Sequence, residues 1–331
     1  MKTADGLREK RALGAVELLY KYGTLLTILV LVAVFGTMAD GFLNGSNIIN
    51  ILRSISIVTI IAIGLTVSLA VGGFDLSVGS AATLANAVVI SMFVWHGQNL
   101  FVGIAVAIVV CLVIGLLNAF LVTSFNIQDM LMTLATMFVI QGVAMTYTKG
   151  ATISENMVMP SGDFATGLIP DAFSKLGSVP WIIIIMLVVV VAVHIFLNFT
   201  KHGRYMYMIG GNPEAAKLSG IAVKRYRLAA YLLSAVFAGV GGIVLAARVM
   251  TAEVNAGAPY LMDAVAAAFI GFSVFGAGKP NAFGTFVGAV LIGILSNGLV
   301  MLSVPYYAMD IVKGSVLALA LGITYYKRKH A

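Results

Sequence analysis

Six side chains that can exchange hydrogen bonds or protons with a solute stand inside or between long apolar stretches of the sequence. They are two carboxylic acids and four amides: Asp75, Asp263, Asn86, Asn118, Gln141 and Asn297. Polar groups inside a membrane are costly, so each of them is a candidate for function. Neutral amides suit a neutral polar solute, whereas the acids could also couple to protons or cations. The set therefore indicates passage of a small solute.

The segment "VGGFDLSVGS" at residues 71–80 places one of these acids between two apolar stretches. Two adjacent glycines allow a break in a helix, and Asp75 or Ser77 can cap the helix that follows. An acid at a helix start meets the positive end of the helix dipole, so it need not be unpaired in lipid. This turn is a candidate pathway or gate element, formed by Gly72, Gly73, Phe74, Asp75 and Ser77.

Motifs for catalysis are weak in this sequence, and we expect no catalytic residue and no metal site. A serine nucleophile at Ser273 would need a positioned base, and His194 is the only histidine deep in an apolar run. "FGAGKPN" at residues 275–281 resembles a phosphate-binding loop, but the required Ser or Thr after the lysine is Pro280. A single cysteine, Cys111, cannot form an intrachain disulfide.

The elements that must position these residues are membrane-spanning helices. Hydrophobic residues make up 60% of the 331 residues and charged residues only 10%, a composition typical of polytopic membrane proteins. The apolar runs are continuous rather than alternating, which excludes a β-barrel. The sequence predicts an all-α protein with ten spans, at residues 23–41, 51–71, 77–96, 100–124, 129–148, 180–199, 227–248, 260–276, 282–303 and 306–326.

The distribution of basic residues predicts the orientation of these spans. With both termini in the cytoplasm, 15 of the 20 lysines and arginines fall on the cytoplasmic side, as the positive-inside rule requires. The net charge of +7 is thereby explained by topology, and nucleic acid is not an expected partner. We expect one transmembrane domain at 23–326, a cytoplasmic N-terminal segment at 1–22 and a cytoplasmic tail at 327–331.

Two of the predicted loops are long. The external loop at 149–179 could hold short interfacial helices, and the internal loop at 200–226 carries most charge. Within the internal loop, Asn212 can cap a helix, Pro213 suits its first position, Glu214 complements its dipole and Gly220 can end it. The sequence therefore predicts one short amphipathic helix on the cytoplasmic face.

Here the chain resembles a known family. Glu-Ala-Ala, three residues and then glycine is the coupling-helix motif of the membrane subunits of ABC importers, and "HGRYMYMIGGNPEAAKLSGI" is similar to its form in ribose-type sugar permeases. "FDLSVGS", "PYLMDAVAAAFIGF" and "GKPNAFGTFVGAVLIGILSNGL" resemble other segments of that family. The resemblance covers residues 45–325. It implies that the helix docking on an ATPase is formed by Gly210, Gly211, Asn212, Glu214, Ala215, Ala216, Lys217, Leu218 and Gly220.

The resemblance also implies a fold and a set of partners. The fold would be like that of the vitamin B12 importers, and the permease would pair as a homodimer, with a heterodimer of paralogues as the alternative. A separate ATP-binding subunit, often with two fused ATPase halves, would supply ATP and Mg, so the chain itself needs no cofactor. An extracytoplasmic sugar-binding protein would deliver a ribose-like monosaccharide, and membrane lipid of the bacterial cytoplasmic (inner) membrane would surround the spans.

Two departures from the family keep the substrate open. Phe74 stands where many members have isoleucine, and Phe272 stands where a second glycine is usual. A nucleoside, an autoinducer furanoside and a branched-chain amino acid are therefore alternative solutes for an ABC permease. A secondary transporter that couples to ions through Asp75, Asp263 and Lys313 is the alternative from another class, and an intramembrane enzyme is a third.

Overall fold

The computed structural model describes residues 22–125, 127–159, 162–274, 278–305, 307–315 and 318. The ordered elements in this part of the chain are helices, and β pairing within it is limited to isolated bridges, Ile153 with Ala252 and Val158 with Phe164. A helix at Tyr22–Met38 comes first. The following helices are α2 (Gly45–Ala70), α3 (Val78–Val94), α4 (Leu100–Phe125), α5 (Asp129–Thr148), α6 (Asp171–Leu176), α7 (Trp181–Phe199), α8 (Lys201–Gly211), α9 (Pro213–Leu218), α10 (Val223–Val249), α11 (Ala258–Ser273) and α12 (Ala282–Met301).

Six of the described helices are long and apolar enough to cross a membrane, namely α2, α4, α5, α7, α10 and α12. Three shorter apolar helices accompany them, Tyr22–Met38, α3 and α11. The chain is therefore a polytopic, all-α membrane protein, as the composition predicted. The tenth expected span, 306–326, lies largely outside the described residues, as do most of the N-terminal segment and the whole tail at 327–331.

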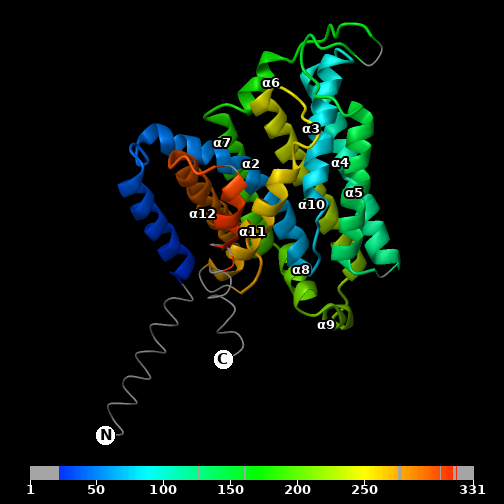
Figure 1. Ribbon diagram of the computed structural model, residues 1–331. Helices are drawn as coiled ribbons and strands as arrows, with labels where there is room; N and C mark the ends of the chain where they lie inside the picture. The colour runs from blue at the N-terminus through cyan, green and yellow to red at the C-terminus, as the bar shows by residue number, and fades with distance from the viewer. Residues whose placement is uncertain are drawn as a thin grey trace. The chain divides into compact units, whose positions relative to one another are not determined.

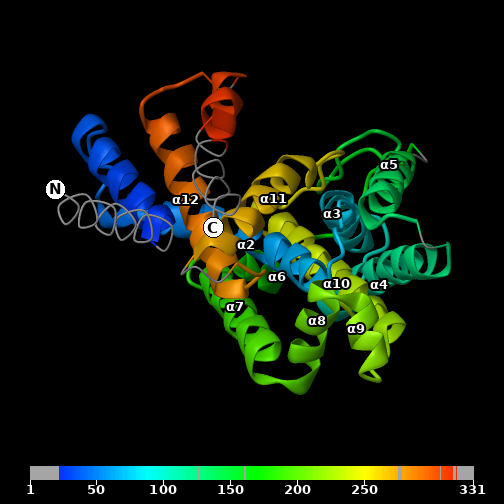
Figure 2. The same cartoon turned by 90° about the horizontal axis from the view of Figure 1, so that it is seen from below.

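The chain divides into two compact units, residues 53–265 and residues 1–52 with 266–331. In the 53–265 unit, α10 is the central helix: it packs along α3 and α4 and also contacts α6, α8 and α9, as Figures 1 and 2 show. Glycine permits these close approaches, because a Cβ at Gly115 of α4 would come 2.8 Å from the carbonyl oxygen of Tyr231 on α10. Small residues thus let neighbouring spans pack backbone to backbone.

The second unit contains its own helix contacts. Asn47 and Asn297 exchange two hydrogen bonds between their side-chain amides, at 2.9 and 3.0 Å. A Cβ at Gly298 of α12 would overlap the ring of Phe35, so α12 lies directly on the Tyr22–Met38 helix. Asn281 caps α12 by accepting a hydrogen bond from the backbone N–H of Gly284.

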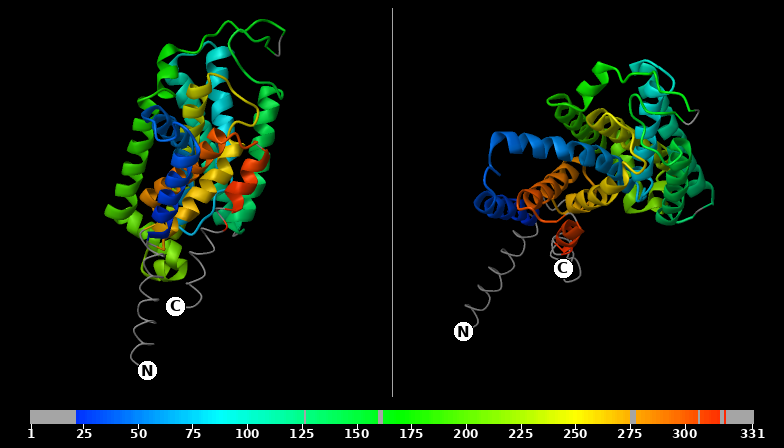
Figure 3. Two further views of the ribbon diagram at one scale, coloured as in Figure 1. Left: turned by 60° about the vertical axis from the view of Figure 1, so that its left-hand side comes forward. Right: turned by 45° about the horizontal axis from the view of Figure 1, so that its top comes forward.

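The expected external loop, 149–179, contains one short helix, α6, within its described part. Its carboxylate Glu155 accepts a hydrogen bond from the backbone N–H of Ile169 at 2.6 Å, and the ring of Phe173 packs edge-on against Phe93 of α3 at 4.9 Å. Figure 3 shows this stretch, drawn in green, at the end of the 53–265 unit that lies away from α8 and α9. The loop is therefore fastened to the helices, and the expected short helix is present.

Candidate functional site

The chain makes a tight break at residues 71–77, between α2 and α3. Gly72 has a φ of +73°, in the left-handed region that glycine adopts without steric cost. A Cβ at Gly73 would come 2.9 Å from both the Asp129 carboxylate and the Tyr231 hydroxyl. The predicted broken-helix turn is confirmed, and it is pressed so closely against α5 and α10 that Gly73 has no room for a side chain.

Asp75 is completely buried in this turn and is fully hydrogen-bonded. Its Oδ1 atom accepts hydrogen bonds from the backbone N–H of Ser77 at 3.0 Å and from the Ser77 hydroxyl at 2.6 Å. Its Oδ2 atom accepts a hydrogen bond from the Ser234 hydroxyl of α10 at 2.8 Å. A buried carboxylate with three donors is held by protein rather than by lipid, so Asp75 fastens the turn to α10.

The expected cap of α3 is present in a different form. Ser77 occupies the N-cap position, but its side chain makes no capping hydrogen bond. Its hydroxyl instead donates to Asp75 and accepts a hydrogen bond from the Asn118 amide of α4 at 2.8 Å. Asp75 binds the N–H of Ser77 itself, which closes an Asx turn before the helix. The capping expectation was therefore wrong in detail, because contacts to α4 and α10 draw both side chains away from the first helical turn.

The turn also contacts the beginning of α5. The hydroxyl of Thr133 donates a hydrogen bond to the carbonyl oxygen of Phe74 at 2.8 Å and accepts one from the backbone N–H of Leu76 at 3.1 Å. Polar backbone groups that would be unsatisfied in lipid are thereby paired inside the protein. Three helices, α4, α5 and α10, consequently hold this turn between α2 and α3.

Sequence reasoning missed the residues of α5 and α10 that complete this network. Asp129 accepts a hydrogen bond from the Tyr231 hydroxyl at 2.6 Å and lies 3.5 Å from the Arg227 guanidinium. A usable signal was present, because Arg227, Tyr231 and Ser234 follow one another at intervals of four and three residues. That spacing places polar side chains on one face of a helix, here the face of α10 that meets the turn.

Two other predicted pathway residues bind a different part of the same unit. Asn86 of α3 is completely buried, and its Nδ2 atom lies 3.4 Å from the carbonyl oxygen of Thr251. Gln141 of α5 donates a hydrogen bond to the carbonyl oxygen of Val254 at 3.1 Å. Both amides therefore face the 250–257 segment between α10 and α11. The Oδ1 atom of Asn86 is buried and has no hydrogen-bond partner among the described residues.

The last two predicted pathway residues are Asn297 and Asp263. Asn297 belongs to the other compact unit, where its amide is paired with that of Asn47. Asp263 is a half-buried residue of α11. Asn118 is thus the predicted amide that joins the turn directly, through its hydrogen bond to Ser77.

The internal loop contains two short helices, α8 and α9, where the sequence predicted one, so Gly210 and Gly211 end α8 and the predicted docking residues are divided between the two helices. The helix expected after Asn212 is α9. The Asn212 side chain accepts hydrogen bonds from the backbone N–H groups of Glu214 and Ala215, both at 3.0 Å, and Pro213 occupies the first turn. Gly220 follows the helix with a φ of +78°. Cap, first position and stop are all where the sequence predicted them.

The surface of α9 is exposed on one side and anchored on the other. Ala216 is 1% exposed, whereas the apolar side chain of Leu218 is 89% exposed. Glu214, Ala215 and Lys217 are exposed as well. The exposed face of α9 thus presents the apolar side chain of Leu218 beside the charged side chains of Glu214 and Lys217.

The end of α8 connects α9 to the 71–77 turn. A Cβ at Gly210 would come 2.5 Å from the carbonyl oxygen of Ala70 and 3.1 Å from the backbone nitrogen of Gly72. The residue that begins the predicted coupling motif therefore touches the turn backbone to backbone. The two motifs singled out in the sequence are in direct contact.

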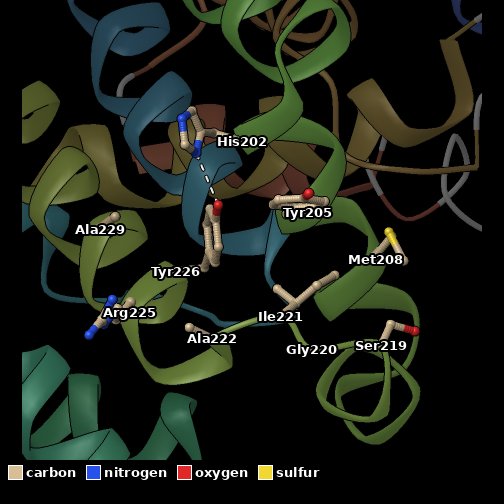
Figure 4. A pocket seen from close by; sticks show the side chains of 10 residues that line it. All are labelled: His202, Tyr205, Met208, Ser219, Gly220, Ile221, Ala222, Arg225, Tyr226 and Ala229. Carbon is tan, nitrogen blue, oxygen red and sulfur yellow. Dashed lines mark hydrogen bonds between the residues drawn. The ribbon is translucent and has the colours of Figure 1, made fainter.

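A cavity of about 520 Å³ lies beside this connection, between α8, the segment after α9 and the start of α10. Figure 4 shows Tyr205 of α8 and Tyr226 of α10 on its walls, with Ile221 below them. His202 and Tyr226 share a hydrogen bond of 3.0 Å across the top. The packing of α8 on α10 is thus incomplete here and leaves space for side chains to move.

The described residues do not include a group of three or more His, Cys, Asp or Glu side chains that could hold a metal ion. The polar contacts of the turn are instead hydrogen bonds between protein groups, apart from the Arg227–Asp129 ion pair. The chemistry available at this site is positioning and conformational coupling.

Comparison with known proteins places these features in a family. A family model described as "Branched-chain amino acid transport system / permease component" matches residues 47–321. The ribose import permease protein RbsC of Escherichia coli (strain K12) is 35% identical over 303 residues, which cover 90% of this chain and 91% of that protein.

Two further relatives are similar over almost their whole length. The ribose import permease protein RbsC of Bacillus subtilis (strain 168) is 33% identical over 327 residues, covering 97% of this chain and 98% of the relative. The galactose/methyl galactoside import permease protein MglC of Salmonella typhimurium (strain LT2) is 32% identical over 322 residues, covering 93% and 95%. No solved structure matches the chain.

Proposed function

The chain belongs to the family of branched-chain amino acid transport system permease components, and we propose that it is the membrane subunit of an ATP-binding cassette importer for a monosaccharide. The backbone contact between Gly210 and the 71–77 turn is the observation that carries this function. It connects the exposed helix α9, which a soluble partner can reach, with the break between two helices of the membrane bundle. The chain is a permease rather than an enzyme.

The proposed mechanism starts at α9. A separate ATPase subunit, with ATP and Mg bound, binds the exposed face of α9 formed by Glu214, Lys217 and Leu218. Because α8 and α9 are short helices joined by a single residue, Asn212, a displacement of α9 is transmitted to Gly210 rather than absorbed by a flexible loop. Gly210 then moves the turn at Gly72, and the turn moves α3.

The polar residues of the turn act in this proposal as a gate and not as sugar ligands. Asp75 and Asn118 are fully buried and already have protein partners. Moving the turn would exchange these hydrogen bonds for others, and such a network has discrete arrangements rather than a continuous range. Asn86 and Gln141 are the better candidates for solute contact, because their amides face the 250–257 segment and take no part in the network of the turn.

A monosaccharide is favoured over the other solutes by two arguments. The relatives that align with most of this chain, at 32–35% identity, are named for the import of ribose and of galactose or methyl galactoside. The proposed solute contacts are neutral amides, which suit a neutral polyol that must bind weakly and leave again. Nucleosides, autoinducer furanosides and branched-chain amino acids are alternatives, the last because the family description names them.

The proposed assembly contains two permease copies with ten spans each, in a fold like that of the vitamin B12 importers, with both termini in the cytoplasm. An extracytoplasmic binding protein delivers the sugar, and an ATPase with two fused halves binds on the cytoplasmic side. The assembly lies in the bacterial inner membrane. The clustering of basic residues in the 200–227 region supports this orientation.

Reconstitution in liposomes tests the function against ion-coupled transport. We expect uptake of labelled ribose, galactose or xylose only when the permease, an ATPase subunit, ATP inside the vesicles and a loaded binding protein are all present. Uptake by the permease alone under a proton or sodium gradient would refute the proposal and support a secondary transporter. Omitting Mg is the control for residual ATP-independent leakage.

A further inference from the structure

A second groove lies outside the site described above, on the surface between α4 and α10. It has a volume of about 240 Å³. Its apolar part is formed by Leu116 and Phe120 of α4 and Leu228 of α10, and its polar end by Thr123, Lys224 and Arg225. Apolar side chains therefore line one end of the groove and two cations the other.

The apolar part faces outward from two helices that are long enough to span a membrane. Leu116 is 53% exposed and Phe120 is 56% exposed, whereas the neighbouring Ala119 is completely buried against α10. Exposed apolar side chains on a spanning helix suit contact with lipid chains. This part of the groove has the shape and chemistry to receive an acyl chain.

The two cations are not neutralised by this part of the protein. Lys224 and Arg225 are both exposed. Among the described residues, the ion pair of this region is formed by the next basic side chain, Arg227, with Asp129. The positive charge of Lys224 and Arg225 is consequently available to an anion that enters the groove.

The length of α10 places these cations at headgroup depth. The helix has 27 residues, which at 1.5 Å per residue give about 40 Å. A hydrocarbon core is about 30 Å thick, so the ends of the helix extend into the headgroup region. Lys224 and Arg225 are the second and third residues of α10, and Leu228 follows them one turn deeper.

We propose that this groove is a binding site for an anionic phospholipid, with the phosphate between Lys224 and Arg225 and an acyl chain along Leu116, Phe120 and Leu228. Basic pockets between spanning helices on the cytoplasmic side suit such headgroups. The groove lies at the end of the unit that carries α8 and α9. Its assignment to the cytoplasmic leaflet therefore rests on the proposed function, which places α8 and α9 on the cytoplasmic side. A phospholipid there would fix α10, the helix that contacts α8, α9 and the 71–77 turn.

Native mass spectrometry of the purified chain tests this proposal with two lipids of identical acyl chains, phosphatidylglycerol and phosphatidylcholine. We expect a tightly retained phosphatidylglycerol on the unmodified protein and a loss of affinity of about tenfold or more in Lys224→Gln/Arg225→Gln. The matched control is Lys201→Gln/Arg204→Gln, which removes two exposed cations from α8 outside the groove. Its retention of phosphatidylglycerol should equal that of the unmodified protein.

A second variant keeps the charges and fills the groove. Leu116→Trp should displace the acyl chain and weaken binding of phosphatidylglycerol. If Lys224→Gln/Arg225→Gln cannot be purified, this variant tests whether the lipid binds in the groove. Equal lipid retention in the α4–α10 variants and the α8 control would overturn the proposal.

Two other occupants are distinguished by the same samples. Loss of the dimer mass, or loss of co-purifying ATPase subunit, with lipid retention unchanged would assign the groove to a second permease copy or to the ATPase. These measurements of bound lipid and bound subunits do not depend on sugar transport by the protein. A failure of sugar uptake would therefore leave the lipid result standing, and a negative lipid result would leave the transport function standing.

Discussion

Gly210 of α8 lies against Gly72 of the 71–77 turn, and a Cβ at Gly210 would come 3.1 Å from the backbone nitrogen of Gly72 and 2.5 Å from the carbonyl oxygen of Ala70. Real Cβ atoms do not approach backbone atoms as closely as 2.5 Å, so a side chain at Gly210 must separate the two segments. The neighbouring Gly211 differs, because no described atom lies within 4 Å of a Cβ at that position.

This pair of glycines gives the first prediction. Gly210→Ala should lower sugar uptake about tenfold or more in reconstituted vesicles and reduce the stimulation of the ATPase by loaded binding protein, because the coupling contact is displaced. Gly211→Ala should retain nearly full activity. The amount of each variant in the membrane is measured by immunoblot, and equal activity of the two variants would show that the contact does not transmit motion.

Asp75 supplies a second prediction, because its charge and its hydrogen bonds can be separated. Asp75→Ala removes the acceptor for three buried donors of Ser77 and Ser234, at a cost of about 1–3 kcal/mol for each group left unsatisfied. Asp75→Asn keeps the shape and one acceptor oxygen. We therefore expect Asp75→Ala to lose assembly and Asp75→Asn to retain it.

Thermal stability in detergent, followed by size-exclusion chromatography, measures this difference. Ser234→Ala should be intermediate, since it removes one of the three donors. If Asp75→Asn unfolds as readily as Asp75→Ala, the negative charge itself is required. Loss of transport by a stable Asp75→Asn variant would assign the charge to the gate.

The contrast between α9 and the turn explains what could be predicted from sequence. Asn212, Pro213 and Gly220 act on backbone groups within a few residues, so their order along the chain is sufficient to define α9. The break at Gly72 could be predicted for the same reason, because it depends on the backbone freedom of that residue itself. The partners of Asp75 are not, because Ser234 is 159 residues away, and only the packing of α10 on α3 brings it to the turn.

The same reasoning applies to the amides. Their placement within apolar stretches made them candidates for the translocation pathway, which stays a prediction. It could not show that the Asn118 amide binds Ser77 of the turn, whereas the Asn86 amide faces the carbonyl oxygen of Thr251. That difference depends on tertiary contacts, which spacing along one helix does not encode.

A third prediction concerns the exposed face of α9. Glu214→Arg reverses the only acidic charge of the helix at its positive end, so it should abolish transport and lower stimulated ATPase activity while the protein stays in the membrane. Asp171→Arg is the matched control, because Asp171 is an exposed acid in the first turn of another six-residue helix, α6.

Co-purification of the ATPase subunit with each variant locates the defect. We expect Glu214→Arg to lose the subunit and Asp171→Arg to keep it. Normal sugar uptake by Glu214→Arg would remove α9 from the proposed coupling mechanism.

The fourth prediction separates a solute contact from a structural amide. Asn86→Ala deletes a buried side chain with one unoccupied acceptor and a weak 3.4 Å contact, so the folded protein loses little while a sugar would lose a hydrogen-bonding group. Asn297→Ala instead breaks both hydrogen bonds to Asn47, worth about 0.5–1.5 kcal/mol each. We expect Asn86→Ala to raise the KM for uptake several-fold at an almost unchanged melting temperature. Asn297→Ala should lower the melting temperature at an almost unchanged KM, and the reverse pattern would transfer the solute contact from α3 to α12.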